Sequence, residues 1–186
     1  QNLAGLFGKP AMDQRRFGMS YRMTKNSISI HKEAPIMLKK LIQMLSPKNP
    51  AHPTPQQTPY QLIGGEAATR RLANRFYDIM ATAPEAAELY AIHPLPLDTI
   101  RQKFFEFLSG WLGGPGLFEQ KYGHPRLRMR HMPFPVNPTL RDQWMFCMNQ
   151  ALLEVVADPV LRGGLSEALG QLASHMINRD EQGQPR

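Results

Sequence analysis

The segment KYGHPRLRMRHMPFPVNPTLRDQWMFCM, residues 121–148, holds two histidines, four arginines, four prolines, a tryptophan and the single cysteine of the chain. Arg126, Arg128 and Arg130 alternate directly before His131. An imidazole at the end of a short helical turn can ligate a metal, while neighbouring guanidinium groups can clamp an anion. The alternative is a solvated histidine in an arginine-rich surface loop. The rest of the chain has to decide between the two interpretations.

Length and composition favour one packed domain. The chain has 186 residues, of which 42% are hydrophobic, enough for a single core with a remainder outside it. One cysteine, Cys147, excludes a disulfide framework and a cysteine-based zinc site, and no CxxCH motif could tether a haem covalently. Cys147 has apolar neighbours on a helical pattern, which favours a buried, inert thiol. A reducing, cytoplasmic environment is expected.

The net charge of +7 belongs to the N-terminal part of the chain. Residues 1–60 carry nine Lys and Arg against two acids, whereas residues 61–186 carry thirteen bases and thirteen acids. The charge therefore gives no reason to expect a nucleic-acid partner. Residues 36–45 form either a short amphipathic helix or part of a poorly ordered extension. A proline-rich linker follows, containing Pro47, Pro50, Pro53, Pro55 and Pro59, and no apolar run is long enough to span a bilayer.

From residue 60 onward the apolar residues recur at helical spacings, and no segment shows strand alternation. We expect an all-α domain over residues 60–180, after a disordered or loosely helical extension (1–59) and before a polar tail (181–186). The expected helices span 66–83, 85–92, 98–112, 138–157 and 159–179, with Asp98 or Thr99 as a cap and Asn137 and Asp158 preceding helix-initial prolines. One apolar stripe is either plain core or the wall of a cofactor pocket; it consists of Ile100, Phe104, Phe107, Leu108 and Trp111.

A non-covalent b-type haem would use these features together. A porphyrin needs flat apolar walls, its propionates need cations, and its iron needs a neutral imidazole. An all-helical domain with an aromatic stripe, a loop histidine and no CxxCH motif meets these needs. His131, the neighbouring arginines and Lys103 would supply the polar part.

Several segments also resemble the group II truncated haemoglobins, over residues 60–179. These are LIGGEAATRRLANRFYDIM (62–80), LYAIHP (89–94), FFEFLSGWLGGP (104–115), KYGHPRLRMRHMPFPV (121–136) and RDQWMFCM (141–148). The resemblance implies a two-over-two helical sandwich in which the helices 66–83, 98–112, 138–157 and 159–179 enclose haem b.

The resemblance also implies roles for individual residues. The proximal iron ligand falls on His131, and the propionate-binding residues fall on Arg130 and Lys103. Tyr77 and Trp144 fall where the family donates hydrogen bonds to the iron-bound ligand. The sequence departs from the family at His93, where Phe or Tyr is usual, and Ile100 is apolar where oxygen-storage globins usually carry histidine. The remaining expected haem contacts are Ile100, Phe104, Phe107, Tyr122, Phe134, Met148 and Met176.

The expected ligands are O2, NO, CO and peroxide. Donors that hold such a ligand firmly favour redox chemistry over delivery, for example nitric oxide dioxygenase or peroxidase-like activity with an external reductase as electron donor. An oxygen-storing or sensing globin without turnover and a haem-free helical interaction module stay open. The oligomeric state, monomer or homodimer, also stays open, as does iron ligation by His93 or Tyr77 when no external ligand is present. Of the other histidines, His124 has a structural position, His175 lies at the core edge, and His31 and His52 are solvated.

Overall fold

The computed structural model describes residues 57–186, and the secondary structure of this part is helical. The elements in chain order are α2 (Pro59–Ile63), α3 (Gly65–Thr82), a 3-10 turn η2 (Pro84–Ala86), α4 (Ala87–Ala91), α5 (Asp98–Trp111), α6 (Leu117–Tyr122), α7 (Leu127–His131), α8 (Pro138–Val155) and α9 (Pro159–His175). The sequence expectation of an all-α domain is confirmed. The expectations for residues 36–45 and for Pro47 to Pro55 lie outside the described residues.

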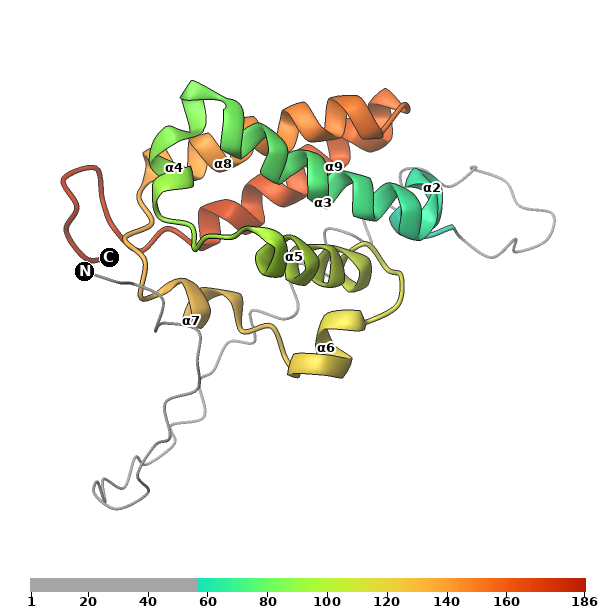
Figure 1. Cartoon of the computed structure of the whole chain (residues 1–186), viewed down its shortest axis with the longest axis horizontal. Helices are drawn as coiled ribbons and strands as arrows, with labels where there is room; N and C mark the ends of the chain where they lie inside the picture. The colour runs from blue at the N-terminus through green and yellow to red at the C-terminus, as the bar shows by residue number, and fades with distance from the viewer. Residues whose placement is uncertain (1–56) are drawn as a thin grey trace, which may run out of the picture.

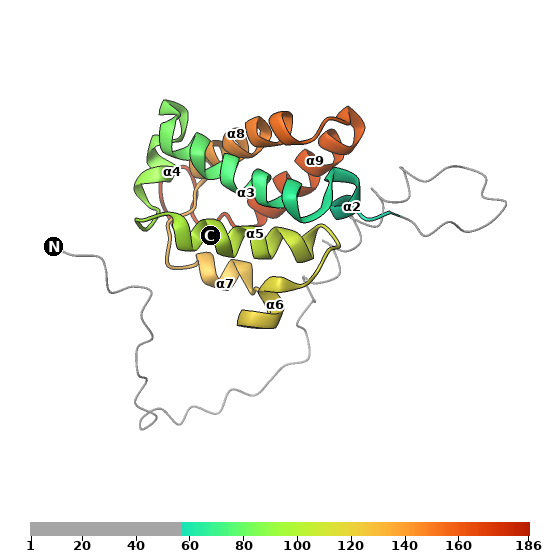
Figure 2. The same ribbon diagram turned by 45° about the vertical axis from the view of Figure 1, so that its right-hand side comes forward.

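Four long helices form the body of the domain. Helix α3 packs against both α5 and α8, and α8 packs against α9, so that α3 and α5 make one pair and α8 and α9 the other (Figures 1 and 2). The core lies between the pairs and contains, among others, Leu72 and Met80 of α3, Leu152 of α8 and Leu165 of α9. This is the two-over-two sandwich that the resemblance to the group II truncated haemoglobins implied. No helix in residues 57–186 combines the length and hydropathy that a membrane crossing requires.

Helices α8 and α9 begin where the sequence places them, because a polar side chain caps each one just before a proline. The Asn137 side chain accepts a hydrogen bond of 2.9 Å from the backbone N–H of Leu140. Asp158 accepts bonds from the N–H groups of Val160 and Leu161, at 2.7 and 3.1 Å. Each cap satisfies N–H groups that have no partner within the helix.

Asp158→Ala is expected to lower the free energy of unfolding by about 1 kcal/mol, since it leaves two N–H groups of the first turn without their acceptor. Urea unfolding followed by circular dichroism measures the loss. Asp158→Asn keeps a side-chain oxygen at the same place and serves as the control. An alanine variant as stable as the asparagine variant would contradict the capping role.

Some boundaries differ from the sequence expectation. Pro59 does not end a linker but begins α2, because Thr58 and Gln61 form a reciprocal capping box around it. Asp98 is the first residue of α5 and does not cap it. Helix α6 was not expected, since six residues are too few to show a helical repeat. Helix α9 ends at His175 and not at residue 179.

Candidate functional site

Helix α5 carries apolar residues on two faces. Phe105 and Leu108 are buried in the core, whereas Ile100, Phe104 and Phe107 are only half-buried. The stripe expected from sequence is therefore divided, with Leu108 on the core-facing side. Half-buried aromatic residues on a second face of one helix leave a flat apolar surface available to a further apolar group.

Aromatic rings from four elements meet at one end of this surface. Tyr77 of α3 lies 5.9 Å from His93 and 5.8 Å from Phe104 between ring centroids, and Phe104 lies 6.2 Å from Trp144 of α8. Phe76 lies beneath them, with centroid distances of 5.0 Å to Tyr77, 5.0 Å to Phe104 and 5.2 Å to Trp144. The structure thus brings together the predicted distal residues Tyr77, Trp144 and His93. Sequence reasoning missed the organising role of Phe76, which has the pattern of an ordinary core residue.

Tyr77 and Trp144 provide hydrogen-bond donors at this point. Burial raises the pKa of Tyr77, opposed by the positive charge of Arg101, whose guanidinium lies 5.7 Å from the Tyr77 ring centroid. The phenol is therefore protonated at neutral pH. Within residues 57–186, neither the Tyr77 hydroxyl nor the Trp144 indole N–H donates to a protein acceptor.

The rings of His93 and His131 are each oriented by a hydrogen bond to the backbone carbonyl four residues earlier. The Nδ1 atom of His131 lies 2.7 Å from the carbonyl oxygen of Leu127, and Nδ1 of His93 lies 2.7 Å from that of Leu89. A carbonyl only accepts, so each Nδ1 carries a proton, and in the neutral form of each ring the lone pair is on Nε2. Burial lowers the pKa of His93, the Leu89 carbonyl opposes this, and repulsion from His131 lowers the pKa further. His93 therefore presents a neutral imidazole near neutral pH.

The predicted cations lie along one rim. The Arg130 guanidinium is 5.7 Å from the Phe118 ring centroid, Phe118 is 4.9 Å from Tyr122 between centroids, and the Lys103 Nζ is 5.6 Å from the Tyr122 centroid. Arg130 and Lys103 thus stand at the two ends of an aromatic pair. Phe107 lies 6.4 Å from Phe118, which joins this rim to the apolar face of α5.

Arg128 does not belong to this rim. Its guanidinium donates to the carbonyl oxygens of His175 and Ile177 at the end of α9. The anion clamp of three alternating arginines, expected from the sequence, is therefore wrong for Arg128. In a helix as short as α7, the direction of each side chain depends on the elements that surround it.

A buried carboxylate ties α5 to the end of α6. Glu106 has an exposed fraction of 0%, receives a 2.7 Å hydrogen bond from Gln102 and pairs with Lys121. Burial alone would raise the pKa of Glu106, but the hydrogen bonds from Gln102 and Lys121 outweigh it and hold the pKa below its ordinary value. This network supports the Tyr122 end of the rim.

Glu106→Gln is expected to lower the free energy of unfolding at pH 7. In the variant, the free energy of unfolding should also depend less on pH in the acid range. The pKa of Glu106 is lower in the folded than in the unfolded state, so its stabilising effect is present above pH 4.5, the ordinary value, and is lost as the pH falls through the lowered folded pKa. Chemical unfolding at pH 7 and at several values below 4.5 measures the difference. A difference between variant and wild type that grows as the pH falls would contradict this assignment.

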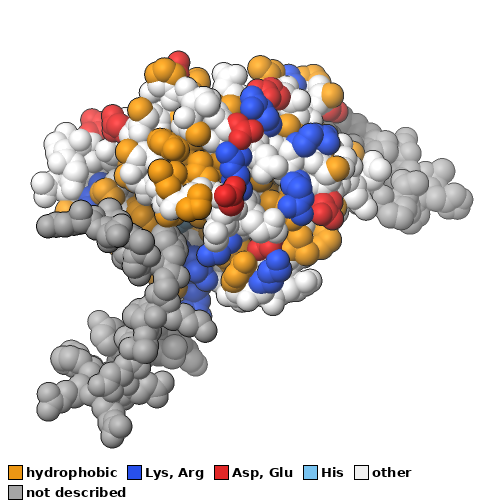
Figure 3. Space-filling model, in the orientation of Figure 1, with side chains coloured by type: hydrophobic (Ala, Val, Ile, Leu, Met, Phe, Trp, Pro, Cys, Tyr) orange, Lys and Arg blue, Asp and Glu red, His pale blue; other side chains and the backbone are white. Residues whose placement is uncertain are grey.

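The remaining predicted residues are distributed around these groups. Phe134 follows α7 and is half-buried, while Met148 and Met176 are buried. His124 accepts a 3.0 Å bond at Nδ1 from the backbone N–H of Arg126, a structural position. Cys147 is fully buried, as expected, and burial raises the pKa of its thiol to about 11. On the face shown in Figure 3, apolar side chains gather around α4 and the loop after it, where Leu95 is 65% exposed.

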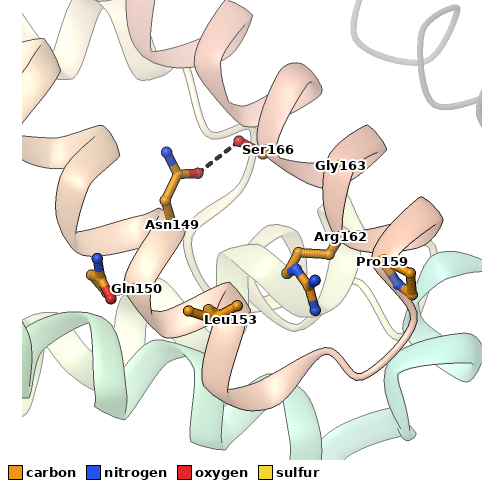
Figure 4. Close-up of a pocket in the computed structure, with 7 residues that line it drawn as sticks. All are labelled: Asn149, Gln150, Leu153, Pro159, Arg162, Gly163 and Ser166. Atoms are coloured by element: carbon orange, nitrogen blue, oxygen red, sulfur yellow. Dashed lines mark hydrogen bonds between the residues drawn. The ribbon is translucent and has the colours of Figure 1, made fainter.

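An open groove of about 330 Å³ lies elsewhere, at the turn between α8 and α9 (Figure 4). Ser166 donates to Asn149 across it at 2.6 Å, and Arg162 donates to the carbonyl oxygen of Val156 at 2.8 Å. The side chains that line it include no histidine, cysteine or carboxylate. His131, His93, Tyr77 and Trp144 are not among its lining residues; they lie on α7, on the loop after α4, on α3 and on α8.

Known proteins are similar to this chain in sequence. The sequence profile of the bacterial-like globins matches residues 58–178. The group 2 truncated hemoglobin YjbI of Bacillus subtilis is 37% identical over 123 residues, which cover 66% of this chain and 90% of that protein.

Solved structures of truncated hemoglobins are also similar to this chain. A cold-adapted truncated hemoglobin from the Antarctic marine bacterium Pseudoalteromonas haloplanktis is 64% identical, with a TM-score of 0.66, and covers 66% of this chain and 99% of its own. A group II 2-on-2 hemoglobin from Agrobacterium tumefaciens is 42% identical, with a TM-score of 0.66, and covers 70% of this chain and 100% of its own. The chain therefore belongs to the bacterial-like globin family, as a group II truncated haemoglobin that binds haem b non-covalently and binds oxygen.

Proposed function

We propose that His131 ligates the haem iron through Nε2, that Tyr77 and Trp144 donate hydrogen bonds to the bound gas, and that the protein carries out redox chemistry on O2, NO or peroxide. The observation that carries the proposal is the convergence of two donors without protein acceptors on the edge of an apolar face. His93 adds a neutral imidazole beside Tyr77.

The residues present fit a haem group. Ile100, Phe104 and Phe107 offer a flat apolar wall on α5. The Leu127 carbonyl holds His131 in the tautomer that leaves Nε2 free to ligate a metal, the usual arrangement for a histidine ligand. The further wall residues in this proposal are Tyr122, Phe134, Met148 and Met176.

Arg130 and Lys103 would bind the propionates. Both lie on the rim beside the Phe118–Tyr122 pair, and no carboxylate of residues 57–186 forms an ion pair with Arg130. An arginine without a carboxylate partner suits bidentate binding of an external carboxylate.

Haem supplies binding of diatomic gases and one-electron transfer when it is bound. The protonated phenol of Tyr77 and the indole N–H of Trp144 stabilise negative charge on the gas and slow its release. Slow release suits turnover better than delivery, and an external electron donor would supply the reducing equivalents.

The test combines spectra with turnover. Absorption spectra of the ferric, ferrous, oxygenated and carbonyl forms establish coordination and ligand competence. Consumption of NO or peroxide in the presence of a chemical reductant is then measured in the steady state. A long-lived oxygenated form that consumes neither would instead support storage or sensing.

A further inference from the structure

Helix α7, which carries His131, is short and makes few contacts with the other described helices. It spans only Leu127–His131, and among the described helices it packs closely against none. Met129 on α7 and Met132 directly after it are 57% and 48% exposed. A five-residue helix is not stable by itself in water, so other contacts must hold this segment in place.

Asn178, just after α9, supplies the central contacts. It has an exposed fraction of 0%. Its Nδ2 donates to the carbonyl oxygens of His131 and Phe134 at 3.1 and 2.9 Å, and its Oδ1 accepts from the N–H of Val136 at 3.1 Å. Its backbone N–H donates to the carbonyl of Val136 at 2.9 Å. One buried amide thus engages the segment from His131 to Val136 at three backbone groups.

Arg128 ties the same short helix to the same place. Its guanidinium donates to the carbonyl oxygens of His175 and Ile177, which lie at the C-terminal end of α9, where carbonyl groups lack helical partners and the dipole favours a cation. The Arg128 side chain therefore anchors α7 to the segment that contains Asn178.

The last residues of the chain hold Asn178 from the other side. The N–H of Arg186 donates to the carbonyl of Asn178 at 3.0 Å, and Arg179 forms an antiparallel bridge with Pro185. Asp180 closes the turn between them, since its Oδ1 accepts from the N–H groups of Gln182 and Gln184 at 3.0 and 2.7 Å. Residues 178–186, here called the C-terminal clasp, form one hydrogen-bonded unit.

We infer that Asn178 is a positioning residue that, through the C-terminal clasp, sets the orientation of His131 toward the haem iron. The inference rests on the proposed role of His131 as the iron ligand. The Leu127 carbonyl orients the imidazole ring, and Asn178 holds the backbone carbonyl of the same residue. Together these bonds restrain both the ring and the main chain of His131.

Asn178→Asp is the sharpest test, because it keeps the shape and Oδ1 but replaces the Nδ2 donor by an acceptor facing two carbonyl oxygens. We expect the iron–histidine stretching band of the ferrous protein, measured by resonance Raman spectroscopy, to shift or broaden. Haem transfer to an excess of apomyoglobin should become about tenfold faster, as expected for the loss of a buried hydrogen bond. In the haem-free protein, the Val136 amide should exchange its hydrogen faster, because the segment from His131 to Val136 opens more often once the two bonds from Nδ2 are lost.

The matched control is Asn149→Asp, the same change at an exposed asparagine of the groove between α8 and α9. It is expected to leave all three readouts unchanged. An Asn178→Asp protein with the wild-type stretching band and haem transfer rate would overturn the inference. If Asn178→Asp does not fold, Asp180→Ala opens the clasp and leaves Asn178 in place; it should speed haem transfer two- to threefold, about half the effect on a logarithmic scale, and an unchanged rate would overturn the inference.

His131→Ala separates this inference from the function on which it rests. If His131→Ala retains the iron–histidine band, the proposed ligand is wrong. If that band is lost in His131→Ala but unaltered in Asn178→Asp, the proposed function stands and the positioning role fails.

Discussion

Replacing Tyr77 and Trp144 together by phenylalanine is expected to accelerate oxygen dissociation by about 10²- to 10³-fold. Each donor to a partly negative ligand contributes about 1.5 to 2 kcal/mol, which is roughly one to one and a half decades in rate. Phenylalanine keeps the six-membered ring of Tyr77 and the benzene part of the Trp144 indole, so most of the contacts with Phe76 and Phe104 are preserved. Rapid mixing of the oxygenated protein with CO, followed by absorbance, measures the rate.

The chain offers a matched control for this pair, because it contains a second tryptophan and another tyrosine packed at the edge of the core. Tyr60→Phe combined with Trp111→Phe makes the same chemical change on α2 and α5, outside the ring cluster. This control should alter oxygen dissociation less than threefold. An unchanged rate in the Tyr77 and Trp144 double variant would contradict the assignment of the donors.

The single variants add a further test. Tyr77 and Trp144 both contact Phe76, and residues that share a packing partner couple energetically. Each variant changes the activation free energy of oxygen dissociation. The sum of the changes in the two single variants is therefore expected to differ from the change in the double variant by about 0.5 kcal/mol or more. Strict additivity would indicate that each donor acts on the ligand independently of their shared support.

His131→Ala is expected to abolish the iron–histidine band of the ferrous protein and to weaken haem binding by more than about 100-fold. Loss of an outer-shell partner of a metal-bound histidine costs 10- to 100-fold in metal affinity, so loss of the ligand itself should cost more. Titration of the haem-free protein with haem, followed by absorbance, measures the affinity. Added imidazole should restore the band in His131→Gly.

His175→Ala is the matched control, since His175 is also a half-buried histidine near the end of a helix. Its backbone carbonyl, which accepts from Arg128, is retained in the variant. If His175→Ala weakened haem binding as much as His131→Ala, the assignment of the iron ligand would be wrong.

Much of the fold could be predicted because its signals are local. Asn137 and Asp158 cap α8 and α9 through bonds to residues two or three positions away, so the sequence contains both partners side by side. The long helices have several turns over which an apolar repeat is visible. Helices α2 and α6 have only five and six residues and show no such repeat. Pro59 reads as a linker residue unless the capping box around it is recognised.

Part of the candidate site could also be predicted from the sequence, and part could not. The family motifs led to Tyr77, Trp144, His93, Arg130 and His131, and the structure brings the rings of the first two together with His93. The acceptors of Arg128 could not be predicted from the alternation of the arginines, because they are the carbonyl oxygens of His175 and Ile177, more than forty residues further along the chain. The importance of Phe76 was hidden for a similar reason, since a buried apolar residue at a regular helical position does not reveal which rings it will support.

By itself, the sequence determined where the long helices α8 and α9 begin. Each start depends on a side-chain bond to a backbone N–H two or three residues away. Only the tertiary structure decided which face of α5 is core, where Arg128 points, and that Asn178 holds the main chain of His131. These contacts join residues far apart in the chain, and they form only once the helices have packed at particular angles, which local propensity does not specify.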